Sequence, residues 1–120
     1  MQVEEHIDGR AKAFRLFVKE DGKEIGHIRL YLIYNDFHEG PYGLFEYIFV
    51  DPDYRGRGIA QQLFTLTEHQ ALVEGSLLLW SIPRKTALSS YTKFGFETVG
   101  GYIETETADA NIYVKKFLPY

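Results

Sequence analysis

The segment DPDYRGRGIAQQLF, residues 51–64, places two glycines beside two arginines at the start of a predicted helix. Glycine is unfavourable at such a position unless the backbone must turn tightly or something must approach it closely. The first N–H groups of a helix lack internal partners and carry partial positive charge, which favours an anion. Gly56 and Gly58 would let a phosphate approach, and Arg55 and Arg57 add positive charge. The segment therefore predicts a phosphate-binding loop; the alternative is a glycine turn that only reverses the chain.

The residues before this loop show the alternation that is typical of β-strands. Residues 14–34 predict a β-hairpin, because two alternating apolar runs flank Asp21-Gly22, a common two-residue turn. Residues 44–50 are apolar on both faces except for Glu46, which predicts a central strand covered on both sides.

After the loop, apolar residues recur at helical intervals over residues 58–74. A second buried strand is predicted over 76–82 and a shorter helix over roughly 85–94. Two further strands, within 96–107 and 111–117, predict a closing hairpin. The expected order is strand-strand-strand-helix-strand-helix-strand-strand, which indicates an α/β fold.

Composition limits the classes of protein that fit. The 120 residues, 45% hydrophobic and 25% charged, are typical of one globular domain, which we expect to cover residues 1–120. The absence of cysteine excludes disulfides, thiolate zinc sites and cysteine nucleophiles, and two candidate ligands in the N-terminal segment are too few to predict a metal. A net charge of −4 argues against a nucleic-acid partner. We expect no membrane segment and a cytoplasmic location, because no apolar stretch is long enough to span a bilayer.

Three kinds of phosphate-binding loop can be compared with this sequence. A Walker loop requires Gly-Lys-Ser/Thr, which the chain lacks. A dinucleotide-binding loop requires a third glycine where this chain has Gln61. The third kind fits better: Val50-Asp51-Pro52, followed by RGRGIA at residues 55–60, resembles the acyl-CoA loop of the GNAT superfamily of N-acetyltransferases, V-x-P and then R/Q-x-x-G-x-G/A.

A second motif carries the same resemblance. The segment ALSSYTKFGF, residues 87–96, resembles the A-x-x-x-Y-x-x-x-G-F segment of that superfamily. The order of elements also matches from residue 14 to the end of the chain. The resemblance implies a mixed, mostly antiparallel sheet with a splayed central strand pair, and two helices after the glycine loop and before the C-terminal hairpin.

The chain departs from the superfamily pattern in two places. Members usually have a strand and two helices ahead of the first hairpin, and here only residues 1–13 precede it. We therefore expect a short form that lacks these elements, with part of the acceptor wall missing or supplied by a second protomer of a homodimer. Where members often have asparagine, this chain has Arg84, which either meets a phosphate or is a solvated surface residue.

The resemblance implies transfer of an acetyl or short acyl group from acetyl-CoA to a primary amine by direct attack. Acyl-CoA would lie in the opening between the strands at 44–50 and 76–82. The implied cofactor-binding residues are Phe49 and Val50 for the pantetheine arm and Arg55, Gly56, Arg57, Gly58, Ile59, Ala60 and Arg84 for the phosphates. Two alternatives stay open: a CoA-binding module without turnover, and an acyltransferase subunit that depends on a partner.

Two residues are predicted to take part in catalysis. The second motif implies that Tyr91 is the general acid that stabilises the departing thiolate; the alternative is a tyrosine that only packs beside neighbouring phenylalanines. Glu46 is the candidate base, since an amine of pKa ~10.4 must lose a proton at a cost of roughly 4.6 kcal/mol at pH 7. Glu46 could instead act through water, position the ammonium, or pair with a neighbouring arginine or tyrosine.

Overall fold

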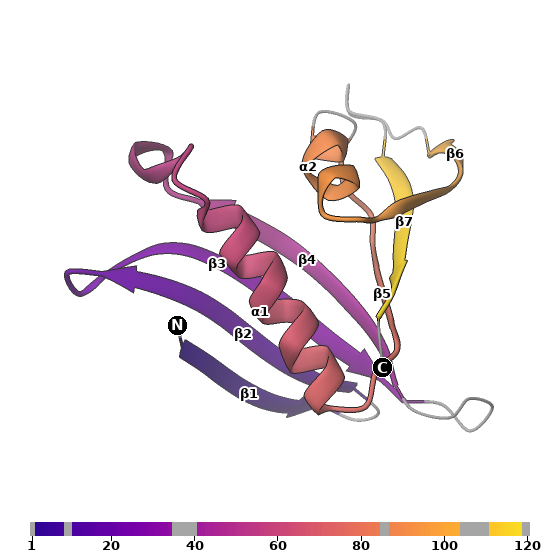
Figure 1. The fold of residues 1–120 in the computed structure, drawn as a ribbon. Coiled ribbons are helices and arrows are strands. Elements are labelled where there is room, and N and C mark those ends of the chain that lie inside the picture. Colours follow the sequence, from indigo (N-terminus) through magenta and orange to yellow (C-terminus); the bar gives the residue numbers. More distant parts are fainter. Residues whose placement is uncertain (1, 9–10, 35–40, 85–86, 104–110, 119–120) are drawn as a thin grey trace.

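The computed structural model describes residues 2–8, 11–34, 41–84, 87–103 and 111–118. These residues form one seven-stranded sheet, two α-helices and a short 3-10 helix, η1 (Figure 1). The strands are β1 (Gln2–Asp8), β2 (Ala11–Glu20), β3 (Lys23–Ile33), β4 (Tyr42–Val50), β5 (Leu78–Ser81), β6 (Glu97–Ile103) and β7 (Asn111–Phe117). The helices are η1 (Pro52–Tyr54), α1 (Ile59–Val73) and α2 (Leu88–Lys93).

The strands follow the order β1-β2-β3-β4-β5-β7-β6, and every neighbouring pair except β4 and β5 is antiparallel. The predicted hairpin is confirmed as β2 and β3, which are joined at Asp21 and Gly22. Both turn residues have positive φ, 51° and 78°, as the tight turn between twisted strands requires. The mixed α/β fold predicted from the sequence is confirmed.

The first strand was not predicted. Gln2–Asp8 pairs antiparallel with β2, in a register that sets Val3 opposite Leu16. The sequence analysis expected this N-terminal strand to be absent, and that expectation was wrong. β1 lies at the edge of the sheet and has only one neighbouring strand. An edge strand can carry many charged residues, and in this segment they hide the alternation of apolar and polar residues by which a strand is predicted. Only two residues separate β1 from β2.

The two central strands part after a short contact. β4 and β5 run parallel and pair only at Gly43 with Leu79 and at Leu44 with Trp80. Beyond these pairs the strands diverge, and Figure 1 shows them close at one end and separate at the other. Beyond Leu44, β4 pairs with β3 alone, so no strand among the described residues lies along the other side of its backbone. The predicted splay of the central pair is confirmed.

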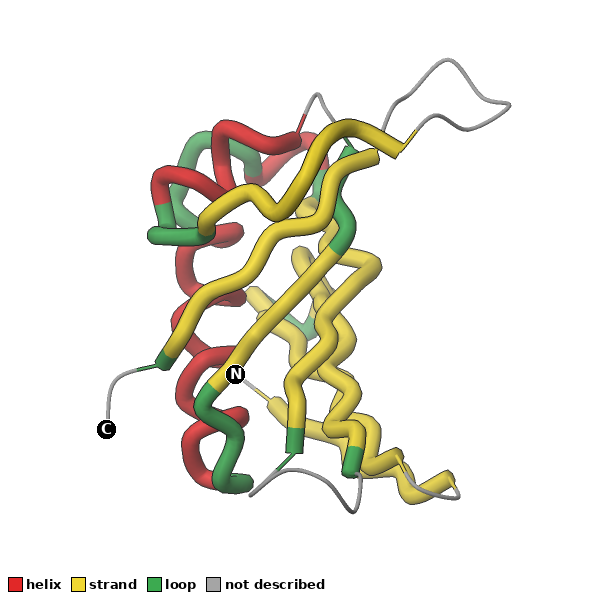
Figure 2. The backbone as a smooth tube through the Cα atoms, turned by 90° about the vertical axis from the view of Figure 1, so that its right-hand side faces the viewer, coloured by secondary structure: helices red, strands yellow, loops and turns green. Residues whose placement is uncertain are grey.

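Helix α1 crosses one face of the sheet, and Figure 2 shows both α-helices on that same side. The buried residues of α1, Ile59, Leu63, Phe64, Thr67 and Ala71, recur at the helical spacing that the sequence shows. They meet the inward side chains of the sheet, including Phe14, Leu16, Ile28, Leu30, Leu32 and Phe45. We call the opposite side of the sheet the open face, because no described helix covers it.

The second half of the chain also follows the prediction. Residues 78–81 form a shorter strand than expected, and α2 occupies the centre of the predicted second helix. β6 and β7 form the closing antiparallel hairpin, although its predicted turn falls largely outside the described residues. In the part of the chain that the structure describes, no helix is long and apolar enough to cross a bilayer. The cytoplasmic location stays a prediction.

Candidate active site

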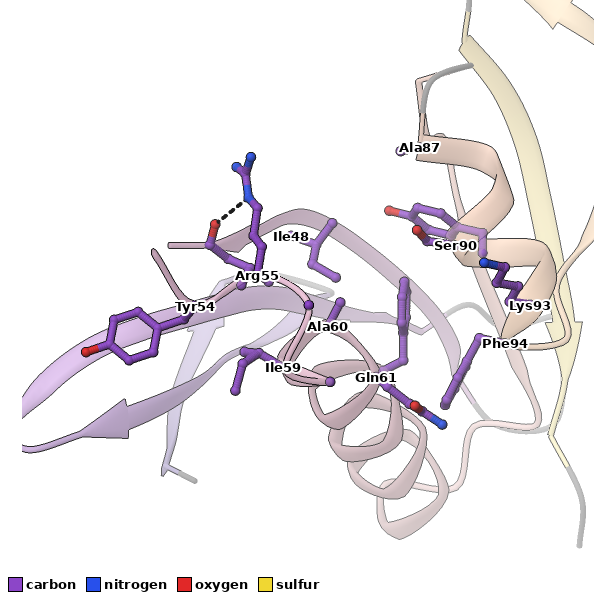
Figure 3. Close-up of a pocket in the computed structure, with 15 residues that line it drawn as sticks. Ile48, Tyr54, Arg55, Ile59, Ala60, Gln61, Ala87, Ser90, Lys93 and Phe94 are labelled. Carbon is purple, nitrogen blue, oxygen red and sulfur yellow. Dashed lines mark hydrogen bonds between the residues drawn. The ribbon is translucent and has the colours of Figure 1, made fainter. Parts of the chain in front are cut away.

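A cavity of about 620 Å³ lies between the start of α1, the far half of β4, and α2. We call it the α1–α2 cavity. Its lining residues are Ile48, Val50, Tyr54, Arg55, Gly56, Gly58, Ile59, Ala60, Gln61, Phe64, Ala87, Ser90, Tyr91, Lys93 and Phe94. Figure 3 shows the labelled residues of α2 facing those of the glycine loop and α1 across this space. The divergence of β4 from β5 places the two helices on opposite sides of it.

The glycine loop, residues 55–60, turns the chain from η1 into α1. Gly56 and Gly58 have φ values of 78° and 79°, in the left-handed region that other residues rarely adopt. A Cβ atom at either position would meet nothing within 4 Å, so the backbone there is open to a ligand. Gly58 is the N-cap of α1 and offers no side-chain cap.

The first turn of α1 has amide groups available for an anion. The N–H of Gln62 is the first to bond back along the helix, to the Gly58 carbonyl at 3.0 Å. The N–H groups of Ile59, Ala60 and Gln61 therefore lack an intrahelical acceptor. Because all three residues line the cavity, the positive end of the helix dipole points to its wall.

The charges around the cavity are positive. Arg55 and Lys93 line it from opposite sides, and no acidic residue is among the described lining residues. The Nε of Arg55 donates to the Val50 carbonyl at 3.2 Å, the bond drawn in Figure 3, which fixes the guanidinium at the end of β4. The cavity is therefore suited to an anionic ligand.

Tyr91 lies at the inner end of the cavity on α2 and is almost fully buried. Its ring stacks on Phe45 with centroids 5.7 Å apart and meets the edge of Phe64 at 5.1 Å. Burial raises the pKa of the Tyr91 phenol above its ordinary value of 10.0, and a hydrogen bond with the Ser81 side chain opposes that rise. The phenol therefore stays protonated at physiological pH and remains a hydrogen-bond donor.

Ser81 marks the point at which β4 and β5 separate. The main-chain pairing ends one residue earlier, at Trp80, and the Oγ of Ser81 continues it by donating to the Phe45 carbonyl at 2.6 Å. Ser81 is 2% exposed, so this bond is shielded from water. Phe45 also carries the ring on which Tyr91 stacks. The bond between Ser81 and Phe45 therefore links the point at which β4 and β5 separate, the vertex of the splay, to the position of Tyr91.

The structure gathers seven of the predicted site residues around the α1–α2 cavity: Val50, Arg55, Gly56, Gly58, Ile59, Ala60 and Tyr91. Four others do not line it. Phe49 is 45% exposed and stacks on His27 with centroids 5.4 Å apart. Arg57 lies over the Tyr54 ring at 4.9 Å, and Arg84 is exposed just beyond β5.

Glu46 is the fourth predicted site residue that does not line the cavity. It lies half-buried on β4, directly opposite Arg29 of β3. Leu44 and Glu46 alternate with buried Phe45, so Glu46 faces away from α1, on the open face. This register sets an arginine opposite Glu46 on the same face of the sheet.

Several lining residues were not predicted. Ala87 and Phe94 lie four residues before and three residues after Tyr91, and Ser90 lies three residues after Ala87 and four before Phe94, so all of them border one side of the helix. That spacing could have identified them. Ile48 gave no such signal, and neither did Ser81, which lies outside the lining, because each resembles an ordinary strand residue. Among the described residues, no group of three His, Asp or Glu side chains is placed to hold a metal ion.

A family model described as an acetyltransferase (GNAT) domain matches residues 12–98. The chain belongs to the GNAT acetyltransferase family. The matched region runs from β2 into β6 and contains the glycine loop and Tyr91. Enzymes of this family use acetyl-CoA as the acyl donor, and the fold supports acyl transfer from CoA.

Solved structures show the same GNAT fold. An acetyltransferase from Bacillus cereus is 22% identical, with a TM-score of 0.78 over 90% of this chain and 74% of its own. Escherichia coli ElaA is 15% identical, with a TM-score of 0.72 over 92% and 70% of the two chains. An aminoglycoside 6'-N-acetyltransferase complexed with coenzyme A is 12% identical, with a TM-score of 0.72 over 92% and 75%. A search of curated protein sequences found no significant match.

Proposed function

We propose that this chain, acting as a single domain over residues 1–120, transfers an acetyl or short acyl group from acyl-CoA to a primary amine by direct attack. The observation that carries the proposal is the α1–α2 cavity, which joins a glycine loop suited to phosphate to a buried, protonated phenol. An acyl donor with a pyrophosphate at one end and a thioester at the other matches both ends of this cavity.

The pyrophosphate would lie on the glycine loop. The free N–H groups of Ile59, Ala60 and Gln61 and the guanidinium of Arg55 supply donors and positive charge on one side. Lys93 supplies charge from α2 on the other side. Arg57 and Arg84 do not line the cavity, so we assign them to the outer phosphates, where exposed long side chains can reach.

The pantetheine arm would add to the open side of β4, as a strand adds to a sheet edge. This side is available because β5 diverges after Trp80. The Val50 carbonyl already accepts from Arg55, so we assign the pairing to β4 groups nearer the vertex, between Phe45 and Phe49. The thioester would then lie near Tyr91, at the inner end of the cavity.

The amine would attack the thioester carbon, and the C–S bond would break as the thiolate leaves. Tyr91 would donate a hydrogen bond to that sulfur. A phenol of pKa ~10 is about 2 kcal/mol too weak an acid to protonate a thiolate whose acid has pKa ~8.5. Because burial raises the pKa of Tyr91 further, we assign it hydrogen-bond donation in the transition state rather than complete proton transfer.

Glu46 is our proposed acceptor-side carboxylate. Its place on the open face of β4 would let it attract the ammonium form of an amine and accept its proton, directly or through water. Arg29 opposite it would hold the carboxylate in place. An acidic chain with a net charge of −4 modestly favours cationic acceptors.

The test is to mix the purified protein with acetyl-CoA and a panel of amines and to measure free thiol. Release of thiol that depends on one class of amine supports the acyltransferase. Tight binding of CoA without thiol release from any amine would favour a CoA-binding module. Activity that is found only after addition of a partner protein would favour the dependent subunit.

The pH dependence of the reaction follows from the Tyr91 pKa, which is raised by burial. A phenol whose pKa is raised by burial is protonated throughout the range from pH 7 to 9.5, so ionisation of Tyr91 should cause no loss of activity in that range. We expect kcat/KM to rise with pH from 7 to about 9.5 as the amine acceptor loses its proton. A falling limb below pH 9 that disappears in Tyr91→Phe would contradict the assigned state of the phenol.

We also propose that the chain forms a homodimer through the open face. Large apolar side chains are exposed on this face because no described helix covers it; they include Phe49, Ile82, Val99, Tyr113 and Phe117, the last 67% exposed. Light scattering should give a mass of roughly twice 13.9 kDa, and Phe117→Lys should shift the protein toward monomer. A fully active monomer at dilute concentration would overturn this prediction.

A further inference from the structure

Lys116 of β7 joins three elements at a point outside the lining of the α1–α2 cavity. Its Nζ donates to Glu68 Oε2 on α1 at 3.0 Å and to the carbonyl oxygen of Phe94 at 2.9 Å. The ammonium also lies 4.5 Å from the centroid of the Phe94 ring. The side chains of Lys116 and Glu68 are only 21% and 18% exposed. The contact is therefore largely shielded from solvent, where such bonds are stronger than at the surface.

The position of Lys116 follows from the strand alternation. Val114 is fully buried beneath the helices, and Lys116, two residues along β7, points to the same face. Phe94 is the C-cap of α2, so its carbonyl belongs to the end of the helix, where acceptors lack helical partners. The ammonium of Lys116 donates to this carbonyl at the end of α2. The same ammonium also contacts Glu68, so that it links the end of α2 to α1.

Helix α2 depends on such contacts because it has only six residues. A helix of this length is not stable alone in water, so its position is set by the elements packed against it. It nevertheless carries one wall of the cavity, including Tyr91, Lys93 and Phe94. Phe94 also stacks on Phe64 of α1 with centroids 5.0 Å apart, directly beside the Lys116 contact.

We propose that Lys116 is a positioning residue for the proposed acyl transfer. It fixes the end of α2 to α1, so that the phenol of Tyr91 keeps its place relative to the glycine loop at the start of α1. Lys116 does not line the cavity and would act only through α2. The inference rests on the proposed function, and its test includes a measurement that does not need turnover.

The chain offers a matched control in the ion pair between Lys12 and Glu74. This pair is 3.2 Å long, its side chains are 28% and 18% exposed, and it joins β2 to the far end of α1. Neither residue lines the cavity. Lys12→Met therefore removes a similar half-buried ion pair between the sheet and α1 but leaves α2 untouched.

The first measurement is amide hydrogen exchange on the free protein. The N–H groups of Phe94 and Phe96 donate to the Tyr91 carbonyl, each at 3.1 Å, and report whether the end of α2 is closed. Lys116→Met should speed their exchange by about tenfold or more relative to the wild type, because local opening becomes easier. Lys12→Met should leave both rates unchanged, and Lys116→Arg, which keeps the charge and the donors, should restore them.

The second measurement is steady-state kinetics on the same variants. Lys116→Met should lower kcat/KM about 10–10²-fold, as expected for a small displacement of a catalytic group, while Lys12→Met stays near the wild type. Should Lys116→Met fail to fold, Glu68→Gln, which weakens the contact with α1 by removing the negative charge and keeps the bond to Phe94, should show the same effects more weakly.

Equal exchange rates in Lys116→Met and Lys12→Met would overturn the inference, whatever the activity. So would faster exchange at Phe94 and Phe96 combined with unchanged kcat/KM in an active enzyme. A wild-type protein that binds no CoA and releases no thiol would instead overturn the proposed function, and the exchange comparison would still show whether Lys116 holds α2.

Discussion

Tyr91→Phe should lower kcat by about 10²–10³-fold, the usual loss when one hydrogen-bond donor to the developing charge is removed. The substitution keeps the ring that stacks on Phe45 and removes only the hydroxyl. Because the hydroxyl is proposed to meet the leaving sulfur only as charge develops there, its loss should affect the transition state more than the bound substrate. The KM for acetyl-CoA and the melting temperature should therefore change little.

Tyr34→Phe is the matched control for this prediction. Tyr34 follows β3, is 41% exposed and does not line the α1–α2 cavity, so removal of its hydroxyl should leave kcat unchanged. The comparison should be made under conditions in which chemistry limits the rate. If Tyr91→Phe then retains the wild-type kcat, Tyr91 is a packing residue among Phe45, Phe64 and Phe96 and nothing more.

Gly58→Asp should weaken CoA binding by on the order of 10²–10³-fold. A carboxylate about 4 Å from a phosphate charge is repelled by about 4 kcal/mol at an effective dielectric constant of 20. Aspartate tolerates the left-handed conformation of Gly58 better than most residues, and a Cβ there meets nothing within 4 Å. The variant should therefore fold, and calorimetric titration with CoA should show the loss of affinity.

Gly75→Asp provides the corresponding control at the other end of α1. Gly75 has a φ of 86° and open space around its Cβ position, as Gly58 does, but it lies outside the cavity. Both variants introduce one negative charge, and both place aspartate at a positive φ, with a similar conformational free-energy cost. The two variants therefore differ mainly in their distance from the cavity. Wild-type affinity for CoA in folded Gly58→Asp would mean that the pyrophosphate does not lie on residues 55–60.

Much of the fold could be predicted because its local signals agree with one another. The β2–β3 hairpin combines strict alternation with a turn at Asp21-Gly22 that only a few residues can form. The face of α1 could be predicted because its buried residues repeat at helical spacing over four turns. The splay between β4 and β5 came from the resemblance of two motifs to a known family, since no periodicity in the sequence encodes it.

The features that the sequence did not predict depend on contacts between distant segments. Ser81 looks like any small residue of a buried strand, and its importance comes from the Phe45 carbonyl 36 residues away. Lys116 looks like a surface lysine in β7 until the fold brings Glu68 and Phe94 beside it. Edge strand β1 lacked a clear pattern because one side of it has no neighbouring strand. All three features depend on contacts between segments that are distant in the sequence, and local sequence patterns contain no information on such contacts.

The most direct test of the account is to titrate isotope-labelled protein with acetyl-CoA and follow the backbone amide signals by NMR. The account predicts that the largest shifts fall on Arg55–Gln61 at the glycine loop and on Ser90–Phe94 of α2, with smaller shifts along Phe45–Val50 of β4. Gly75 and the β2–β3 turn should not respond. Saturable shifts confined to the open face, or no shifts at the glycine loop at saturating acetyl-CoA, would contradict the placement of the acyl donor in the α1–α2 cavity.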